Sequence, residues 1–217
     1  YLLIVADGMG GHRAGEVASS MVVTHLGKRF NDLVTVGTKY DATNWLKDNI
    51  SEINHHIVEY ASNNPESKGM GTTVVVALLT HDFLLYANVG DSSGFAMKNG
   101  HLLKVTKDHT LVQLLVQAGD LTEEEAKYHP KKNVLMKALG GEEDVVPDIY
   151  EVDMSFDAIL LSSDGLTNML SNEAIEKVLN DPELSVEEKV VKLIRKCNAR
   201  GGTDNISVAY LVKESGE

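Results

Sequence analysis

Two spacings of hydrophobic residues alternate along this chain, and each predicts a different kind of element. In segments 15–30 and 44–63, apolar side chains recur three or four positions apart, which places them on one face of a helix. Segment 31–40 is predicted as a polar connection between these two helices. Further helices are predicted over residues 110–118, 122–128, 172–179 and 185–198, with capping boxes at Thr122/Glu125 and Ser185/Glu188.

The segments between these helices are rich in β-branched residues and predict strands. The predicted strands cover residues 2–6, 72–80, 83–89, 148–153, 158–162 and 205–212, and residues 94–106 form a hairpin. His81-Asp82 and Asn99-Gly100 are the expected tight turns. Strands joined mainly by hairpins, with helices grouped in pairs, predict an α+β fold in which antiparallel sheets pack against outer helices.

Size, charge and cysteine content limit the possible functions. The 217 residues, 43% of them hydrophobic, suit one domain with a real core. The net charge of −12 argues against a nucleic-acid partner. The single cysteine excludes an internal disulfide. The chain also has no apolar run long enough to span a bilayer. Together these two features favour a cytoplasmic protein. Because a strand-like segment begins directly after Tyr1, we expect that an N-terminal strand segment is missing.

Four aspartates occupy the same kind of position, at the end of an apolar strand with a glycine within three residues. They are Asp7, Asp91, Asp164 and Asp204. A single Asp-Gly pair is most simply a turn, but four beside buried strands suggest carboxylates that converge. Converging carboxylates repel one another unless a cation lies between them, and an all-oxygen site suits Mg²⁺, Ca²⁺ or Mn²⁺ rather than zinc.

Other catalytic patterns are absent or misspaced. The segment GMGGHRAG carries Arg13 where a dinucleotide-binding loop has its third glycine, and no Walker loop is present. Cys197 and Arg200 are too close in sequence for a thiolate phosphatase loop. No G-x-S-x-G elbow is present, which removes the α/β-hydrolase pattern.

Five motifs carry a resemblance to a known family. In chain order they are ADGMGGH (6–12), GMGTT (69–73), NVGDSSG (88–94), SSDGL (162–166) and GGTDN (201–205). They resemble the motifs of the metal-dependent Ser/Thr protein phosphatases, the PPM or type 2C family, in its bacterial branch. Residues 106–140 are similar to that branch's flap and adjoining segment. The resemblance implies one catalytic domain over residues 1–217.

The resemblance implies a four-layer αββα sandwich of two antiparallel sheets flanked by helix pairs, with a binuclear Mn²⁺ or Mg²⁺ centre. Asp7 would bridge the two ions and the Gly8 carbonyl would ligate one of them. Asp164 and Asp204 would hold the other ion. Asp91, with Asp164, matches the ligands of a third, weaker metal site in this family.

The implied reaction is hydrolysis of phosphoserine and phosphothreonine in proteins by a metal-activated water. His12 matches the histidine that protonates the leaving alkoxide, and an imidazole of ordinary pKa suits that role. The implied partners are phosphoprotein substrates and a Ser/Thr kinase of the same cell. Thr72 and Thr73 begin a strand, where a structural role is the default, and the family adds a position near the metals.

Two alternatives stay open at this point. The family pattern has arginine where this chain has Ser93, and its N-terminal strand supplies a phosphate-binding arginine and an acidic pair. These departures allow a pseudophosphatase that binds phosphoproteins without turnover. A calcium-binding structural domain is the second alternative, although no local D-x-[DN]-x-[DN]-G loop occurs.

Near the flap, Asp108 is interpreted as the cap of the helix that follows it.

Overall fold

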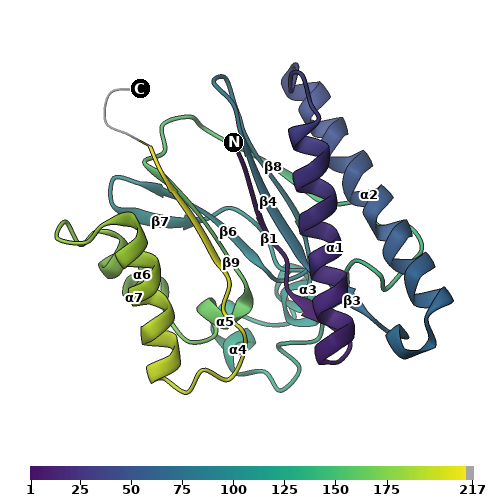
Figure 1. Cartoon of the computed structure of the whole chain (residues 1–217). Helices are drawn as coiled ribbons and strands as arrows, with labels where there is room; N and C mark the ends of the chain where they lie inside the picture. Colours follow the sequence, from purple (N-terminus) through teal and green to yellow (C-terminus); the bar gives the residue numbers. More distant parts are fainter. Residues whose placement is uncertain (214–217) are drawn as a thin grey trace.

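Two four-stranded antiparallel sheets lie between two pairs of helices, giving four layers in the order helices, sheet, sheet, helices (Figure 1). This computed structural model describes residues 1–213, without the side chain of His12. The predicted α+β class and αββα sandwich are confirmed. No helix among the described residues combines the length and apolar character needed to cross a membrane.

The first sheet has the strand order β1-β4-β5-β8, with every neighbouring pair antiparallel. Its strands are β1 (Leu2–Val5), β4 (Val74–Leu79), β5 (Leu84–Val89) and β8 (Asp148–Val152). The predicted strand 72–80 is divided, because Gly71–Thr72 (β3) leaves the sheet and pairs with Gly8–Met9 (β2). This small ribbon ties the segment after Asp7 to the start of β4.

The second sheet has the order β10-β9-β6-β7 and is also antiparallel. Its strands are β6 (Ser93–Lys98), β7 (His101–Lys104), β9 (Ala158–Ser162) and β10 (Val208–Val212). The predicted turn at Asn99-Gly100 is present, with φ of 52° and 78° at these two residues. Positive φ at both central positions suits the twist of a tight hairpin.

Helices α1 (His12–Asn31) and α2 (Lys39–Asn63) cover the first sheet, and α6 (Asn172–Leu179) and α7 (Val186–Ala199) cover the second (Figure 1). Both predicted capping boxes are present. Helix α2 begins earlier than predicted because Thr38 and Asp41 form a further capping box within the expected connection. A 3-10 turn, η1 (Pro65–Ser67), and a short helix, α5 (Asp164–Thr167), were not predicted.

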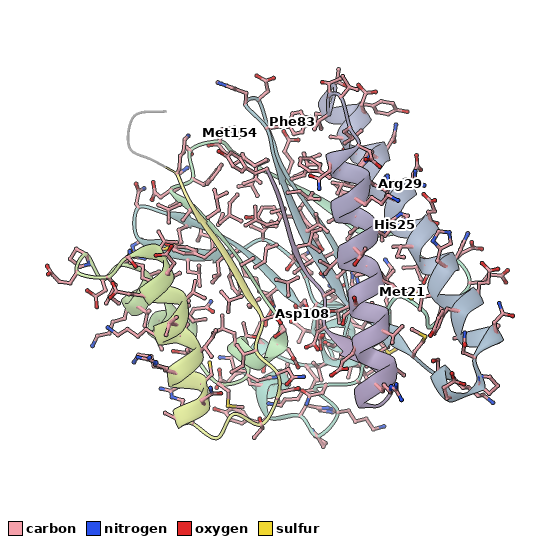
Figure 2. The ribbon with its side chains drawn as sticks, viewed as in Figure 1. Met21, His25, Arg29, Phe83, Asp108 and Met154 are labelled. Atoms are coloured by element: carbon pink, nitrogen blue, oxygen red, sulfur yellow. The ribbon has the colours of Figure 1, made fainter. Side chains whose placement is uncertain are left out.

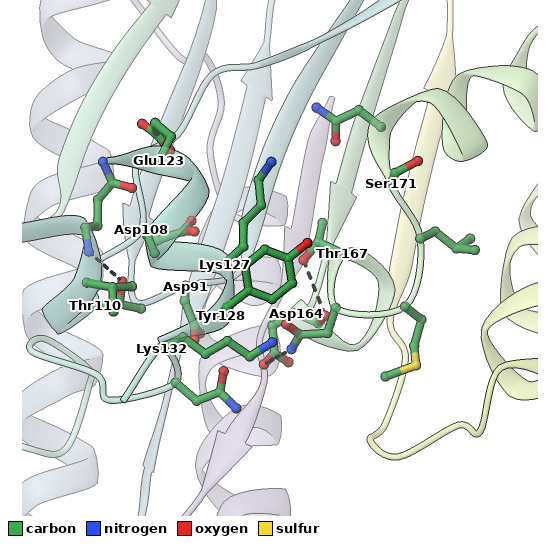
Figure 3. Close-up of a pocket in the computed structure, with 18 of the residues that line it drawn as sticks. Asp91, Asp108, Thr110, Glu123, Lys127, Tyr128, Lys132, Asp164, Thr167 and Ser171 are labelled. Atoms are coloured by element: carbon green, nitrogen blue, oxygen red, sulfur yellow. Dashed lines mark hydrogen bonds between the residues drawn. The ribbon is translucent and has the colours of Figure 1, made fainter. Parts of the chain in front are cut away.

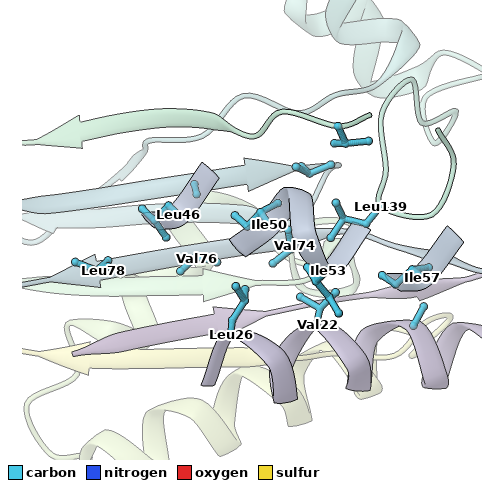
Figure 4. Close-up of a cluster of buried hydrophobic side chains, with 14 of the residues drawn as sticks. Val22, Leu26, Leu46, Ile50, Ile53, Ile57, Val74, Val76, Leu78 and Leu139 are labelled. Atoms are coloured by element: carbon cyan, nitrogen blue, oxygen red, sulfur yellow. The ribbon is translucent and has the colours of Figure 1, made fainter. Parts of the chain in front are cut away.

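Apolar side chains fill three interfaces between the four layers. Leu26 of α1 and Leu46 and Ile50 of α2 pack with Val74 and the other inward residues of β4 (Figure 4). Tyr86, Phe156 and Ile159 belong to the cluster between the sheets, and Phe95, Ile175 and Leu193 to the cluster between the second sheet and its helices. Removing apolar surface from water stabilises the fold by about 25 cal/mol per Å². The packing of these three clusters therefore fixes how the strand ends of the two sheets meet.

Residues 106–140 form an excursion at one end of the sandwich. Helices α3 (Leu111–Ala118) and α4 (Glu123–Tyr128) project from it, and an isolated bridge between Thr110 and Leu135 closes its base. Thr110, not Asp108, caps α3, so the interpretation of Asp108 as a helix cap is wrong; its carboxylate instead pairs with Lys104 Nζ at 2.7 Å. Asp108 lies at the opposite end of the sheets from Phe83 and Met154 (Figure 2).

Candidate metal centre

The two sheets bring the predicted aspartates to the same end of the sandwich. Asp7 follows β1 of the first sheet, and Asp164 follows β9 of the second. Their carboxyl groups lie close enough for each to change the pKa of the other, and the charge of Asp204 raises the pKa of both. Asp91, which follows β5, acts electrostatically on Asp7 and is itself affected by Asp164. All four predicted carboxylates therefore belong to one electrostatic cluster.

Burial and mutual repulsion change the acidity of these groups. Burial, followed by the charges of Asp164 and Asp204, raises the pKa of Asp7 to about 7. Burial, followed by the charges of Asp164 and Asp108, raises the pKa of Asp91 to about 7. Burial and the charge of Asp204 also raise the pKa of Asp164. At Asp91 the charge of Lys104 offsets only part of this rise. A bound divalent cation would stabilise the ionised form of the cluster.

The donor set is all oxygen. Among the described side chains of residues 1–213, no group of three acidic, histidine or cysteine residues is placed to hold one ion by itself. Mg²⁺ and similar hard ions keep several waters and take one or two carboxylates each, so an incomplete protein cage with shared carboxylates fits them. The exposed Gly8 lies directly beside Asp7 and offers a backbone oxygen at this position. The residues present therefore fit hard divalent ions.

The glycines after two of the aspartates allow close backbone contacts. A Cβ on Gly8 would lie 2.0 Å from the Gly15 carbonyl oxygen, in the first turns of α1. A Cβ on Gly165 would lie 2.2 Å from the Asn205 carbonyl oxygen. Both distances exclude any larger residue. Gly8 thus lets α1 approach Asp7, and Gly165 lets the segment that carries Asp204 approach Asp164.

Side-chain amides and backbone groups orient the carboxylates. Asn168 directly follows α5 and lies one turn beyond Asp164. Its Nδ2 donates a hydrogen bond to Asp164 Oδ2 at 2.9 Å. The Asn205 backbone N–H donates to Asp204 Oδ1 at 2.8 Å. Asn168 was not identified from the sequence. Its only local signal is the four-residue spacing from Asp164, which places both side chains on one helical face.

His109 connects the excursion to the loop that carries Asp91. The Gly90 N–H donates to His109 Nδ1 at 3.1 Å, and the His109 N–H donates to the Gly90 carbonyl at 2.9 Å. On the other side of the ring, Nε2 lies 3.3 Å from Asp148 Oδ2. Burial lowers the pKa of His109, which favours the neutral ring with its proton on Nε2. This role was not predicted, because Gly90 and Asp148 are distant in sequence.

A groove of about 590 Å³ opens beside the carboxylates, between α4 and the segment from α5 to α6 (Figure 3). Asp91 and Asp164 line one end of it. The remaining walls are mainly polar and include Lys127, Tyr128, Lys132, Thr167 and Ser171. Its size and polarity suit a short stretch of peptide that leads into the carboxylate cluster.

Two further sequence predictions concern His12 and Ser93. The His12 side chain lies outside the described part of the structure; its backbone begins α1 directly after Gly10 and Gly11, which both have positive φ. Ser93 is the first residue of β6 and is buried, and its hydroxyl has no hydrogen-bond partner within residues 1–213. Ser93 is therefore a core position of the second sheet and does not line the groove.

Comparison with known proteins identifies close relatives. A family model described as protein phosphatase 2C matches residues 1–206. The serine/threonine phosphatase stp of Listeria monocytogenes is 41% identical over 214 residues, 98% of this chain and 84% of its own. Protein phosphatase PhpP of Streptococcus pneumoniae is 38% identical over 97% of this chain and 85% of its own.

Solved structures agree in fold over nearly the whole chain. Serine/threonine phosphatase Stp1 from Staphylococcus aureus has a TM-score of 0.93 and 37% identity, over 99% of this chain and 84% of that one. The catalytic domain of the phosphatase PstP, in complex with two manganese ions, has a TM-score of 0.83 and 36% identity, over 95% and 85%. From its motifs, its fold and these similarities, the chain belongs to the protein phosphatase 2C family.

Proposed function

We propose that this chain is a metal-dependent serine/threonine protein phosphatase whose two divalent ions are held by Asp7, Asp164 and Asp204 and the Gly8 carbonyl. The observation that carries the assignment is the convergence of Asp7 and Asp164 from opposite sheets beside Asp204, where burial and the two neighbouring charges raise the pKa of Asp7 to about 7. A protein does not retain such repulsion without compensation, and bound cations supply it.

The chain's own residues have separate parts in hydrolysis. Ions bound at this site would acidify a water molecule and offset negative charge on the phosphoryl oxygens. Asp7 and Asp164 would hold those ions, and Asn168 orients Asp164 through a hydrogen bond. The groove beside them positions the substrate peptide. As the water oxygen bonds to phosphorus and the ester P–O bond breaks, His12 gives its proton to the departing serine or threonine oxygen.

The finer assignments rest on the family resemblance and on the donor set. We propose Mn²⁺ or Mg²⁺ as the ions, with a third, weaker site formed by Asp91 and Asp164. Residues 1–217 would form one catalytic domain, and residues 106–140 its flap. The substrates would be phosphoproteins modified by a Ser/Thr kinase of the same cell, in the cytoplasm.

The pseudophosphatase alternative rests on Ser93 and on the expected loss of an N-terminal strand segment. Ser93 is buried in β6 and does not line the groove. A serine there removes no group that faces the carboxylates. The calcium-binding alternative would require Ca²⁺ affinity without turnover. Retention of the four carboxylates and the adjoining groove supports the enzyme over both.

A direct test is phosphate release from a phosphothreonine peptide in the presence of Mn²⁺, Mg²⁺ or Ca²⁺, and in EDTA. We expect release with Mn²⁺ or Mg²⁺ and none in EDTA. Ca²⁺ binding without release under any metal would favour the structural domain. Phosphopeptide binding without release would favour the pseudophosphatase. Release that persists in EDTA would contradict the metal-dependent mechanism.

A further inference from the structure

Two buried hydroxyl groups lie between the strand ends that carry Asp7 and Asp91. Thr73 Oγ1 and Ser92 Oγ are 2.7 Å apart, and these residues are 3% and 0% exposed. Thr73 comes from the β3–β4 junction and Ser92 from the loop before β6. Buried hydroxyl groups are tolerated in a core when they are hydrogen-bonded, so the partners of this pair show what it holds in place.

Thr73 holds the backbone of Asp7 from two directions. The Asp7 N–H donates to Thr73 Oγ1 at 3.1 Å, and the Thr73 N–H donates to the Asp7 carbonyl at 2.9 Å. The neighbouring Thr72 hydroxyl donates to the same carbonyl at 2.8 Å. The peptide groups on both sides of the Asp7 side chain are therefore fixed by this threonine pair.

Thr73 also contacts both residues that flank Asp91. Its hydroxyl pairs with Ser92, and its methyl group lies against Gly90, where an added Cβ would be 2.6 Å from Thr73 Cγ2. Gly90 has a φ of +106°, so the close contact and the backbone conformation both require glycine. One side chain thus joins the Asp7 peptide to the loop of Asp91.

We infer that Thr73 and Ser92 are positioning residues that set the separation of Asp7 and Asp91 and thereby tune divalent-ion affinity on the Asp91 side of the centre. This inference rests on the proposed metal site. Neither hydroxyl needs to touch an ion, because each acts through the backbone of a ligand. Residues that orient metal ligands in this way typically contribute 10–100-fold to metal affinity.

The chain offers variants that separate positioning from stability. Thr73→Val keeps the side-chain shape and removes the link to Ser92, and Ser92→Ala removes it from the other side. Thr72→Val also removes a buried hydroxyl bonded to the Asp7 carbonyl, but Thr72 has no bond to the Asp91 loop within the described residues. Ser93→Ala removes a neighbouring buried hydroxyl that has no partner there. Thr73→Ser retains the hydroxyl and should restore the wild-type response.

The measurement is a Mn²⁺ titration of each variant, followed both by phosphate release and by calorimetric binding, with thermal unfolding in EDTA as the stability readout. We expect Thr73→Val and Ser92→Ala to raise the half-saturating Mn²⁺ concentration roughly tenfold or more. Thr72→Val should lower the melting temperature similarly and shift Mn²⁺ affinity less than Thr73→Val does, because it loosens the Asp7 carbonyl but leaves the link to the Asp91 loop intact. Ser93→Ala should change neither. The double variant Thr73→Val/Ser92→Ala should match Thr73→Val, because Ser92→Ala removes only the link that Thr73→Val already removes.

The outcomes separate this inference from the proposed function. If the wild-type chain binds Mn²⁺ but releases no phosphate, the proposed function fails, and calorimetry still decides the inference. If Thr73→Val and Thr72→Val shift Mn²⁺ affinity equally, the hydroxyl pair is only structural and the inference is wrong. The same conclusion follows if Thr73→Ser behaves like Thr73→Val, or if the wild-type chain binds no Mn²⁺.

Discussion

Asp7 and Asp164 follow strands of opposite sheets, and their carboxyl groups lie close enough for each to change the pKa of the other. Each is the first acidic residue after a buried strand, and each is followed by a glycine that admits a close backbone neighbour. Packing of the two sheets therefore determines the geometry of the centre. Burial of the apolar layers stabilises the fold and so holds these like charges close together. A bound cation would relieve their repulsion.

Removing one charge should raise metal-free stability while abolishing activity. We expect Asp164→Asn to lower kcat at least about 100-fold in Mn²⁺, because it removes a proposed ligand. In EDTA, the same change should increase the free energy of unfolding by roughly 0.5–2 kcal/mol, since it relieves repulsion with Asp7 and Asp204. Urea unfolding and phosphate release measure the two effects. Exposed Asp153, next to Met154 at the opposite end, gives the control Asp153→Asn. It should leave kcat unchanged and should not raise metal-free stability, because the Asp153 carboxylate accepts a hydrogen bond from the Ser155 N–H. Lower metal-free stability of Asp164→Asn would contradict the electrostatic account.

The metal-free chain should become less stable as pH rises from about 4 to about 7. The folded-state pKa of Asp7 and of Asp91 is about 7, above the ordinary carboxyl value near 4. Between these limits the folded chain binds protons that the unfolded chain has lost, so the free energy of unfolding falls with pH and levels off above 7. Urea unfolding in EDTA across this range tests the slope. The variant Asp7→Asn should have a shallower slope, and an unchanged slope would show that Asp7 does not titrate there.

Gly8 and Gly165 should not tolerate a methyl group. Gly8→Ala and Gly165→Ala would place a Cβ 2.0 and 2.2 Å from backbone carbonyl oxygens. The backbone must then move, at a cost of about 1–3 kcal/mol in unfolding free energy, as for other overpacked positions. Gly27, within α1, has no atom within 4 Å of an added Cβ. Gly27→Ala should therefore stabilise the chain by about 0.5–1 kcal/mol, and equal effects at the three sites would contradict the packing explanation.

His109 should be required to anchor the 106–140 segment. His109→Leu leaves the Gly90 N–H without its acceptor, which should lower the unfolding free energy by about 1–3 kcal/mol. It should also increase the rate of limited proteolysis within 106–140, because the contact with Asp148 is lost too. His55 is half exposed, and its Nε2 lies 3.4 Å from the exposed Asp144, so His55→Leu is the matched control. Equal proteolysis rates for the two variants would remove the anchoring role.

The elements with strong local signals were predicted closely from the sequence. The bounds of β9 (158–162) and α6 (172–179) agree with the prediction. Helix α1 begins at His12 rather than at residue 15, after a glycine that supplies no side-chain cap and therefore no sequence signal. Helix α5, at Asp164–Thr167, is too short for a hydrophobic period to identify it.

The candidate site divides in the same way. The four aspartates were found because each has a local pattern of strand, acid and glycine. The partners that hold them were not found: His109 reaches Gly90 only through the return of the 106–140 segment, and the Thr73–Ser92 pair joins two different strand connections. Such contacts depend on tertiary packing, and no residue spacing in a single sequence encodes them.

The central claim is that the carboxylate cluster binds the ions that drive phosphate ester hydrolysis. Its most direct test is phosphate release from a phosphothreonine peptide as a function of free Mn²⁺, for the wild-type chain, Asp164→Asn and Asp153→Asn. The account predicts saturable Mn²⁺ dependence in the wild-type chain and Asp153→Asn, and loss of release in Asp164→Asn. Equal release from Asp164→Asn and the wild-type chain at the same Mn²⁺ concentration would contradict it.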